Sequence, residues 1–235
     1  QIFESEGSTV AAVASRSPEK ARKFAAEHGI ERAYGDYESL LEDASIDGIY
    51  VATPHSHHAA AAIRAMQQGK HVLSEKPLAL DYGEVMQMVD ASEQTGKTLM
   101  EGFMYRFHPL MAKVRELVQS GAVGRVRKLS AAFAFRAGYD PERRLFNPAL
   151  GGGGILDVGC YPLSFVRRIA GIALGTGCAE PVKLQAMGTL EPSGVDGYAS
   201  ALVRFPEDLI AEISCGVSLR TPARAMIVGE EGIIE

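Results

Sequence analysis

The first hundred residues alternate short apolar runs with helix-like segments, and this alternation is the feature that most constrains the fold. The apolar runs read as buried strands, and we expect them at residues 8–15, 32–35, 46–53, 70–74 and 97–103. Between them we expect helices at residues 17–29, 36–44, 57–69 and 81–96. Strand–helix–strand units of this kind build a parallel sheet with helices on both faces. The first half therefore predicts a doubly wound α/β fold.

After about Arg106 the pattern changes. A helix is expected at residues 108–121, an alternating strand at 126–137, a loop at 139–154 and an apolar helix at 155–171. The rest of the sequence reads as strands joined by hairpin turns. The sequence thus predicts a first domain at residues 1–105 and a second, α+β domain at 106–235 with a largely antiparallel open sheet.

The composition excludes several classes of protein. The 235 residues are 46% hydrophobic and 23% charged, with a net charge of −5, which is ordinary for a soluble globular protein and gives no basic surface for nucleic acid. No apolar segment looks long enough to cross a bilayer. The three cysteines show neither metal nor disulfide spacing, which fits a reducing compartment and predicts a cytoplasmic location.

Both ends of the sequence look incomplete. A dinucleotide-binding fold normally opens with a strand, a Gly-x-Gly-x-x-Gly loop and a helix, and its ribose-contacting residue follows roughly 20 residues later. Here the strand that precedes that residue would end at Ser15, so the glycine loop would fall before Gln1. The sequence stops at "GEEGIIE", inside what reads as a hairpin. We therefore expect that the chain is a piece of a longer protein.

Ligands of parallel sheets bind beyond the carboxyl ends of the strands, and the first such end carries a basic residue. The stretch "SRSPEK" offers Arg16 with hydroxyls from Ser15 and Ser17, and no acid precedes Glu19. An arginine in this place accommodates a 2′-phosphate, whereas an acid bonds the free ribose hydroxyls. This predicts NADP, with NAD as the alternative cofactor. Arg16 as a solvated loop cation, with Ser17 only a helix cap, is the other interpretation.

The second strand end carries three histidines in "TPHSHH". His55, His57 and His58 lack the i, i+4 spacing of a helical zinc pair and have no acid among them, so we predict no metal site. A strand end that feeds a helix start favours contact with a cofactor instead.

The glycine-rich stretch "GGGGILDVGCYP" leads into the apolar helix. Asp157 and Tyr161 stand at i and i+4 of that helix and should share one face. A buried acid and phenol on an apolar helix need polar partners. They are either a satisfied structural pair or a substrate-facing acid and a proton-transferring tyrosine.

The third strand end, "HVLSEKPLAL", carries a lysine between an acid and a proline. Lys76 is either part of a solvated turn or a catalytic ammonium, with Glu75 and a cis bond at Pro77 fixing its direction. A tyrosine with a pKa near 10 is a poor base, and a nearby ammonium lowers that pKa. Lys76 and Tyr161 together would suit hydride transfer, in which an alcohol is positioned and loses its proton as hydride leaves carbon.

These motifs, in this order, resemble one family. "VASRSPEKA", "YVATPHSHHAAAAIRAMQQGKHV", "SEKPLAL", "MEGFMYRFHP", "GAVGRVR" and "GGGGILDVGCYP" cover nearly the whole chain. They are similar to the glucose–fructose oxidoreductase/inositol dehydrogenase/MocA-like (Gfo/Idh/MocA) oxidoreductases. "MYRFHP" with "DVGCYP" looks most like the branch of dimeric dihydrodiol dehydrogenases and NADP-dependent D-xylose 1-dehydrogenases.

The resemblance implies a Rossmann domain followed by an α/β domain whose open sheet often forms a dimer face. It implies that Lys76 is the catalytic lysine, Asp157 holds substrate and Tyr161 is the acid/base. The cofactor-lining positions that it implies are Thr53, Pro54, His55, His58, Glu75, Lys76 and Arg106. Phe146 and Asn147, just before the glycines, are weaker candidates for the substrate pocket.

Two functional hypotheses follow. The first is an NADP-dependent oxidoreductase that acts on a small-molecule sugar or cyclic alcohol, at aldopyranose C1 or on a trans-dihydrodiol, as a homodimer or higher homo-oligomer. The second is a relative that binds nucleotide or a partner without turnover, or an inactive fragment, since the cofactor half is truncated.

Overall fold

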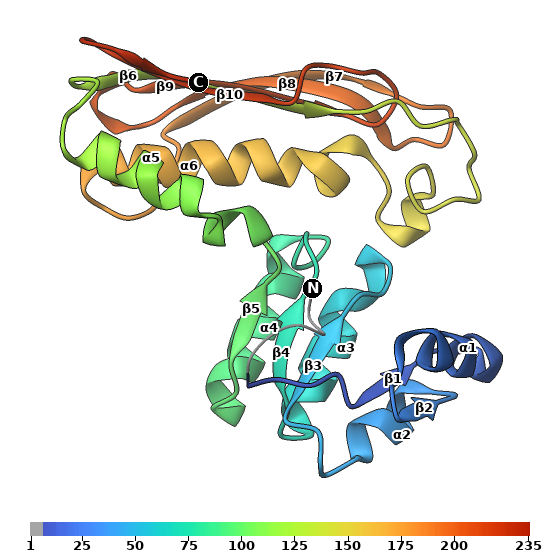
Figure 1. Ribbon diagram of the computed structural model, residues 1–235. Helices are drawn as coiled ribbons and strands as arrows, with labels where there is room; N and C mark the ends of the chain where they lie inside the picture. Colours follow the sequence, from blue (N-terminus) through green and yellow to red (C-terminus); the bar gives the residue numbers. More distant parts are fainter. Residues whose placement is uncertain (1–6) are drawn as a thin grey trace. The chain divides into compact units, whose positions relative to one another are not determined.

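The structure is a computed structural model that describes residues 7–235 (Figure 1). The chain divides into two compact units. The first comprises Gln1–Ala52, Ala59–Ser74 and Gly83–Met100, and the second comprises Thr53–His58, Glu75–Tyr82 and Glu101–Glu235. Two loops from the first half of the sequence therefore pack as parts of the second unit. The predicted domain boundary after residue 105 stays a prediction.

The first unit is built from parallel strands and helices. Strand β1 (Ala12–Ala14) pairs in parallel with β2 (Arg32–Tyr34), and β3 (Gly48–Val51) pairs in parallel with β4 (His71–Ser74). Strand β5 (Leu99–Glu101) lies beside β4 in the same sheet. The helices are α1 (Pro18–His28), α2 (Tyr37–Glu42), α3 (His58–Gln67) and α4 (Tyr82–Thr95). This order of elements confirms the predicted parallel α/β fold, although each strand is shorter than its apolar run.

The predicted helix signals act as expected. The Ser17 hydroxyl accepts a hydrogen bond from the backbone N–H of Lys20 at 3.3 Å and caps α1. The Asp36 carboxylate accepts one from Ser39 at 2.7 Å and caps α2. Gly29 ends α1 in the left-handed region, with φ of 65°, where a side chain would be strained. The Ser17 and Asp36 caps fix where α1 and α2 begin, and therefore where the loops after β1 and β2 end.

The second unit contains one six-stranded sheet with the order β11-β10-β6-β9-β8-β7. Its strands are β6 (Val126–Ala134), β7 (Lys183–Leu190), β8 (Asp196–Arg204), β9 (Ile210–Gly216), β10 (Arg224–Gly229) and β11 (Ile233–Ile234). The β6–β9 pair is parallel and every other pair is antiparallel. The predicted, largely antiparallel sheet is confirmed.

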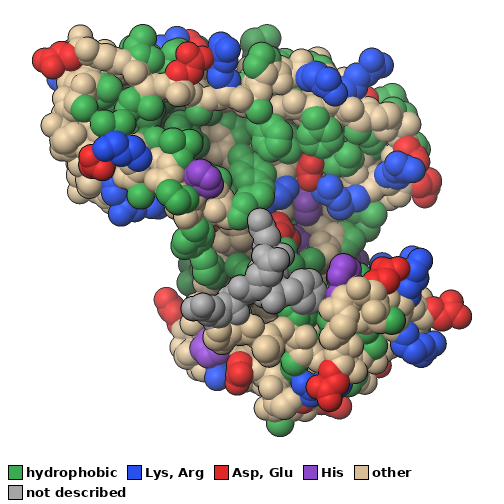
Figure 2. Space-filling view, viewed as in Figure 1, with side chains coloured by type: hydrophobic (Ala, Val, Ile, Leu, Met, Phe, Trp, Pro, Cys, Tyr) green, Lys and Arg blue, Asp and Glu red, His purple; other side chains and the backbone are tan. Residues whose placement is uncertain are grey.

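Helices α5 (Pro109–Gln119) and α6 (Cys160–Leu174) cover one face of this sheet (Figure 1). Helix α6 buries Val166, Ile169 and Ala170 against Leu129 of β6 and Val203 of β8, which form the main core of the unit. Figure 2 shows hydrophobic side chains gathered on the visible face of this unit, with charged side chains toward its ends. This core fixes the position of α6, and the candidate site lies at the start of that helix.

One helical stretch among the described residues, Pro148–Leu174, is long and apolar enough to cross a membrane, with a mean hydropathy of 1.2. This corrects the expectation that no segment reaches that length. Half of its most apolar part is buried inside the protein, because α6 packs into the core of the second unit. The stretch is therefore a core helix of this unit.

The glycine run is required by close packing at the N-terminal end of this helical stretch. Gly153 has φ of 109°, and a Cβ atom there would lie 2.3 Å from Asp196 Oδ1. Asp196 Oδ2 in turn accepts a hydrogen bond from the Ile155 N–H at 2.7 Å. We expect Gly153→Ala to lower the free energy of unfolding by about 1–3 kcal/mol through backbone strain, measured by urea unfolding. Gly138→Ala is the control, since a Cβ atom at Gly138 would meet no other atom within 4 Å; equal effects would contradict the assignment.

Candidate active site

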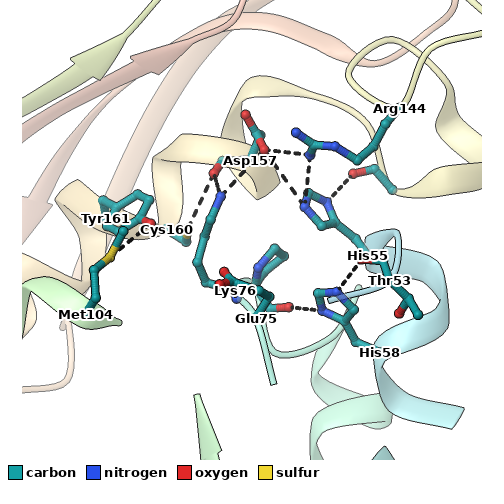
Figure 3. Close-up of polar contacts among 12 residues, drawn as sticks. Thr53, His55, His58, Glu75, Lys76, Met104, Arg144, Asp157, Cys160 and Tyr161 are labelled. Carbon is teal, nitrogen blue, oxygen red and sulfur yellow. Dashed lines mark hydrogen bonds and ion pairs between the residues drawn. The ribbon is translucent and has the colours of Figure 1, made fainter. Parts of the chain in front are cut away.

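The candidate site brings the Lys76 ammonium against Asp157 (Figure 3). Lys76 lies just after β4, in the Glu75–Tyr82 segment that belongs to the second unit. Its Nζ atom donates a hydrogen bond to the Asp157 backbone carbonyl at 2.5 Å and lies 3.5 Å from Asp157 Oδ1. The Lys76–Pro77 peptide bond is cis, as predicted. The side chain is mostly buried, so the interpretation of Lys76 as part of a solvated turn is wrong.

A buried histidine joins the two loops of the site. His58 is fully buried at the start of α3. Its Nδ1 lies 2.8 Å from the Pro77 carbonyl oxygen, and its Nε2 lies 2.9 Å from the Thr53 carbonyl oxygen. The predicted cofactor-lining stretch and the lysine turn are therefore held together by one imidazole.

Asp157 is the centre of the polar contacts. It lies in a π-helical turn, Ile155–Gly159, directly before α6, and only 4% of its surface is exposed. Its Oδ1 atom is 2.7 Å from Arg144 Nη1, 3.5 Å from Lys76 Nζ and 3.9 Å from His55 Nε2. Such single π-helical turns occur frequently at functional sites. Asp157 is thus a buried carboxylate paired with two cations, Arg144 and Lys76, that come from different segments.

Tyr161 lies on the other side of Lys76 from Asp157, in the first turn of α6. The Lys76 Nζ atom is 5.2 Å from the centre of its ring. The ring packs against Phe103, Phe133 and Tyr105 at centroid distances of 5.6, 5.7 and 6.1 Å. Its hydroxyl donates to Met104 Sδ at 3.6 Å. The acid and the phenol therefore both lie beside one ammonium.

The expected lowering of the Tyr161 pKa is not found. Burial raises the pKa of Tyr161 to about 12, because the aromatic surroundings disfavour the phenolate, and neighbouring acidic groups add to the rise. The Lys76 ammonium donates to Asp157 rather than to the phenol oxygen. In this structure Tyr161 is a firmly protonated acid.

Burial also raises the pKa values of Cys160 and Glu101, two other titratable groups near Lys76. It raises the pKa of Cys160 to about 12, so this residue stays a neutral thiol and not a nucleophile. Burial raises the pKa of the Glu101 carboxyl, whose Oε1 accepts from the Leu78 N–H at 2.9 Å. Cys160 therefore does not compete with Tyr161 for the role of proton carrier at neutral pH.

Part of the "TPHSHH" stretch has a structural role. His55 is buried, and its Nδ1 lies 2.8 Å from the Gly151 carbonyl oxygen, while His57 is exposed. Burial lowers the pKa of His55. Within residues 7–235 no group of three or more histidine, cysteine or carboxylate side chains is placed to hold a metal ion.

The remaining cofactor candidates belong to different units. In the first unit Arg16 is exposed after β1, and the Ser15 hydroxyl accepts from the Ser17 N–H at 3.2 Å. In the second unit the Arg106 guanidinium donates to the Ser164 hydroxyl at 2.7 Å and lies 4.7 Å from the Phe103 ring centre. Arg106 is therefore attached to α6 as well as to the segment after β5.

The two weaker pocket candidates have structural roles. Phe146 is 1% exposed and packs with Val195 and Val217 in a small core, so its ring presents almost no surface to a substrate. Asn147 Oδ1 accepts from the Ala149 N–H at 2.9 Å and caps a short 3₁₀ turn. The apolar character of Phe146 marked a buried position, and the sequence alone could not tell a core from a pocket wall.

Arg144 is the site residue that the sequence did not single out. It lies in the irregular loop between β6 and the glycine run and reaches both Asp157 and His55. The adjacent basic pair, Arg143 and Arg144, was the only signal, and a basic pair in a loop usually faces solvent. Neither helical nor strand periodicity extends over this loop, so spacing could not reveal the contact.

Comparison with known families assigns both parts of the chain. Residues 2–103 match the family described as "Oxidoreductase family, NAD-binding Rossmann fold". Residues 111–235 match the family described as "GFO/IDH/MocA C-terminal domain". Together the two matches cover the segments that carry the candidate cofactor residues and the candidate catalytic residues.

Curated relatives have similar sequences over most of the chain. The trans-1,2-dihydrobenzene-1,2-diol dehydrogenase of Danio rerio is 38% identical over 96% of this chain and 65% of its own length. That of Mus musculus is 34% identical over 96% of this chain and 66% of its own length. An uncharacterized oxidoreductase of Rhizobium meliloti is 37% identical over 87% of this chain and 59% of its own length. The chain thus spans about 59–66% of these relatives.

Solved structures agree with this assignment. The aldose–aldose oxidoreductase of Caulobacter crescentus, complexed with glycerol, matches with a TM-score of 0.86 and 31% identity, over 99% of this chain and 70% of that one. A 3-ketoreductase of Actinomadura kijaniata, in complex with TDP-benzene and NADP, matches with a TM-score of 0.82 and 28% identity, over 99% of this chain and 68% of that one. The parallel first unit, the antiparallel second unit and the sequence matches lead to one conclusion: the chain belongs to the Gfo/Idh/MocA family of NAD(P)-binding oxidoreductases.

Proposed function

We propose that the protein transfers hydride between NADP and a CH–OH group of a sugar or cyclic alcohol. The observation that carries this proposal is the position of the Lys76 ammonium, which lies 3.5 Å from the Asp157 carboxylate and 5.2 Å from the Tyr161 ring centre. A cation, an acid and a phenol around one point can hold a hydroxyl group and exchange its proton. The family match supplies the hydride chemistry that this geometry complements.

The residues of the cofactor-lining stretch fit a bound nucleotide. Thr53 Oγ1 and Ser56 Oγ are buried without a hydrogen-bond partner among the described residues, and buried polar groups in native proteins are normally paired. A cofactor along the 53–58 stretch would satisfy them. In this proposal Thr53, Pro54, His55 and His58 line the cofactor, Glu75, Lys76 and Arg106 lie beside its nicotinamide half, and Ser15 and Arg16 receive its ribose phosphate.

A bound nicotinamide cofactor would supply the acceptor or donor of the hydride. The chain's own groups manage the substrate hydroxyl. Lys76 donates a hydrogen bond to that oxygen, and Asp157 fixes the direction of the ammonium. In the oxidation direction the phenolate form of Tyr161 takes the proton of the alcohol, and in the reduction direction the phenol gives its proton to the new alcohol oxygen. The rings of Phe103, Phe133 and Tyr105 hold the Tyr161 ring in place beside Lys76.

The substrate class follows from the relatives and from the site together. The named relatives are dihydrodiol dehydrogenases and an aldose–aldose oxidoreductase, and this site combines one ammonium and one carboxylate with aromatic rings. Vicinal hydroxyls on a six-membered ring would bind the charged groups, and the ring itself would pack on the aromatic side chains. We therefore propose an aldopyranose oxidised at C1 or a trans-dihydrodiol. The test measures NADPH absorbance with a panel of aldoses and dihydrodiols. Absence of turnover on every member, with NADPH bound, would contradict an enzymatic function.

The proposed cofactor preference depends on Arg16. Replacing it with alanine should reduce kcat/KM for NADP by about 10- to 100-fold, since a charge-assisted hydrogen bond to the 2′-phosphate is lost. The corresponding value for NAD should change by less than about threefold, because NAD lacks this phosphate. Arg22→Ala, in the following helix, is the control. Equal losses for both cofactors would show that Arg16 does not read the phosphate.

We also propose that the protein forms a homo-oligomer in the cytoplasm. Strand β7 is exposed along its whole length, with Met187 86% exposed, and Leu202 on the same face of the neighbouring strand β8 is 51% exposed. Apolar side chains gathered on a sheet face suit association with a second copy. The three cysteines are free, as in a reducing compartment. Sedimentation of the protein and of Met187→Lys tests the association.

A further inference from the structure

Arg144 connects two buried groups of the candidate site with a single nitrogen. Its Nη1 atom lies 2.7 Å from Asp157 Oδ1 and 3.1 Å from His55 Nε2 (Figure 3). The side chain as a whole is 42% exposed, but those of its two partners are 6% and 5% exposed. A long side chain thus enters from a surface loop and ends on two groups that solvent barely reaches.

The hydrogen-bond partners fix the protonation state of His55. Its Nδ1 faces the Gly151 carbonyl oxygen, which only accepts, so Nδ1 carries the proton. Its Nε2 faces the Arg144 guanidinium, which only donates, so Nε2 is the bare acceptor. His55 is therefore a neutral imidazole of one defined tautomer. It accepts a hydrogen bond from the same guanidinium nitrogen that donates to the carboxylate.

The charges around Asp157 show what this arrangement does for the lysine. One carboxylate oxygen is shared by two cations, with Arg144 at 2.7 Å and Lys76 at 3.5 Å. Arg144 makes the shorter contact, so it balances most of the carboxylate charge. Without Arg144, Lys76 would be the one remaining cation beside a buried carboxylate and would be drawn into a closer ion pair. A fully paired ammonium is a weaker donor to a substrate hydroxyl.

We propose that Arg144 is a positioning residue: bridging Asp157 and His55, it fixes the carboxylate and keeps the Lys76 ammonium available to the substrate. This inference rests on the proposed function, because its effect on rate requires that Lys76 serves a substrate. The contacts of Arg144 with Asp157 and His55 are independent of turnover. Arg144 does not touch the reacting atoms.

The kinetic test uses three variants. Arg144→Ala and Arg144→Gln should lower kcat by about 10- to 100-fold with KM for substrate within about threefold, since one charge-assisted contact is lost. Guanidinium ion at millimolar concentration should restore part of the rate of Arg144→Ala. Arg143→Ala is the matched control, because Arg143 is 81% exposed and pairs with Asp140. A kcat for both Arg144 variants equal to that of Arg143→Ala would overturn the proposal.

Two measurements on the folded protein separate this inference from the proposed function. In ¹⁵N spectra, the His55 Nε2 signal should move toward the position of a free acceptor in both Arg144 variants. Acetylation of Lys76 by acetic anhydride, followed by mass spectrometry, should slow severalfold in the same variants. If wild type lacks turnover but both changes occur, the proposed function fails and the role of Arg144 stands. An unchanged His55 signal or unchanged Lys76 labelling overturns the role, whatever the activity.

Discussion

Lys76→Met is expected to lower kcat for hydride transfer by about 10²- to 10⁴-fold, the usual contribution of a positioned group in acid–base catalysis. Methionine keeps the length and the apolar stem of the side chain. It removes the ammonium that meets the Asp157 backbone oxygen at 2.5 Å and its carboxylate at 3.5 Å. The measurement is steady-state NADPH absorbance with the best substrate of the panel, and circular dichroism checks the fold.

The charge alone should not restore the rate. Lys76→Arg keeps a positive charge, but the planar guanidinium is larger and bonds in a different geometry than the compact ammonium. We therefore expect it to remain at least about tenfold below wild type. Lys113→Met, on the exposed side of α5 where Lys113 pairs with Glu116, is the matched control and should be unchanged. A rate for Lys76→Met within about tenfold of wild type would show that Lys76 does not position the substrate.

The parts of the fold that depend on local sequence could be predicted. Apolar runs gave the parallel strands β1 to β4, and Ser17 and Asp36 marked two helix starts. The Glu-Lys-Pro motif indicated a special turn, and the Lys76–Pro77 bond is indeed cis. In each case the physical cause lies within a few residues of its effect, which is why one sequence was sufficient.

The parts of the site that depend on packing could not be predicted in the same way. Arg144 reaches its partners from an irregular loop that has no periodicity, and His55 lies 89 positions away along the chain. Burial decides the state of Tyr161 by raising its pKa, whereas the sequence led us to expect a nearby cation to lower it. Sequence motifs indicated the cation but not the rings of Phe103 and Phe133 that bury the phenol.

Tyr161 is the second residue whose substitution should have a large effect on the rate. Tyr161→Phe should lower kcat by about 10²- to 10⁴-fold, because the proton carrier is lost while the ring and its packing remain. The hydroxyl makes one weak contact in the structure, to Met104 Sδ at 3.6 Å. Stability to urea should therefore change by less than about 1 kcal/mol, so that a loss of rate reports on chemistry rather than on folding.

The pH dependence of the wild-type rate tests whether Tyr161 acts as the acid in reduction and as the base in oxidation. Because burial raises the pKa of Tyr161 to about 12, the phenol is protonated at every pH below that value. As an acid in the reduction direction it is ready throughout, and that rate should be flat from about pH 6 to 9. In the oxidation direction the phenolate is the base, so the rate should rise with pH, and Tyr161→Phe should lose this slope. Tyr139→Phe, an exposed tyrosine that packs on Phe146, is the control. A variant that keeps both the wild-type rate and the slope would place the proton carrier elsewhere.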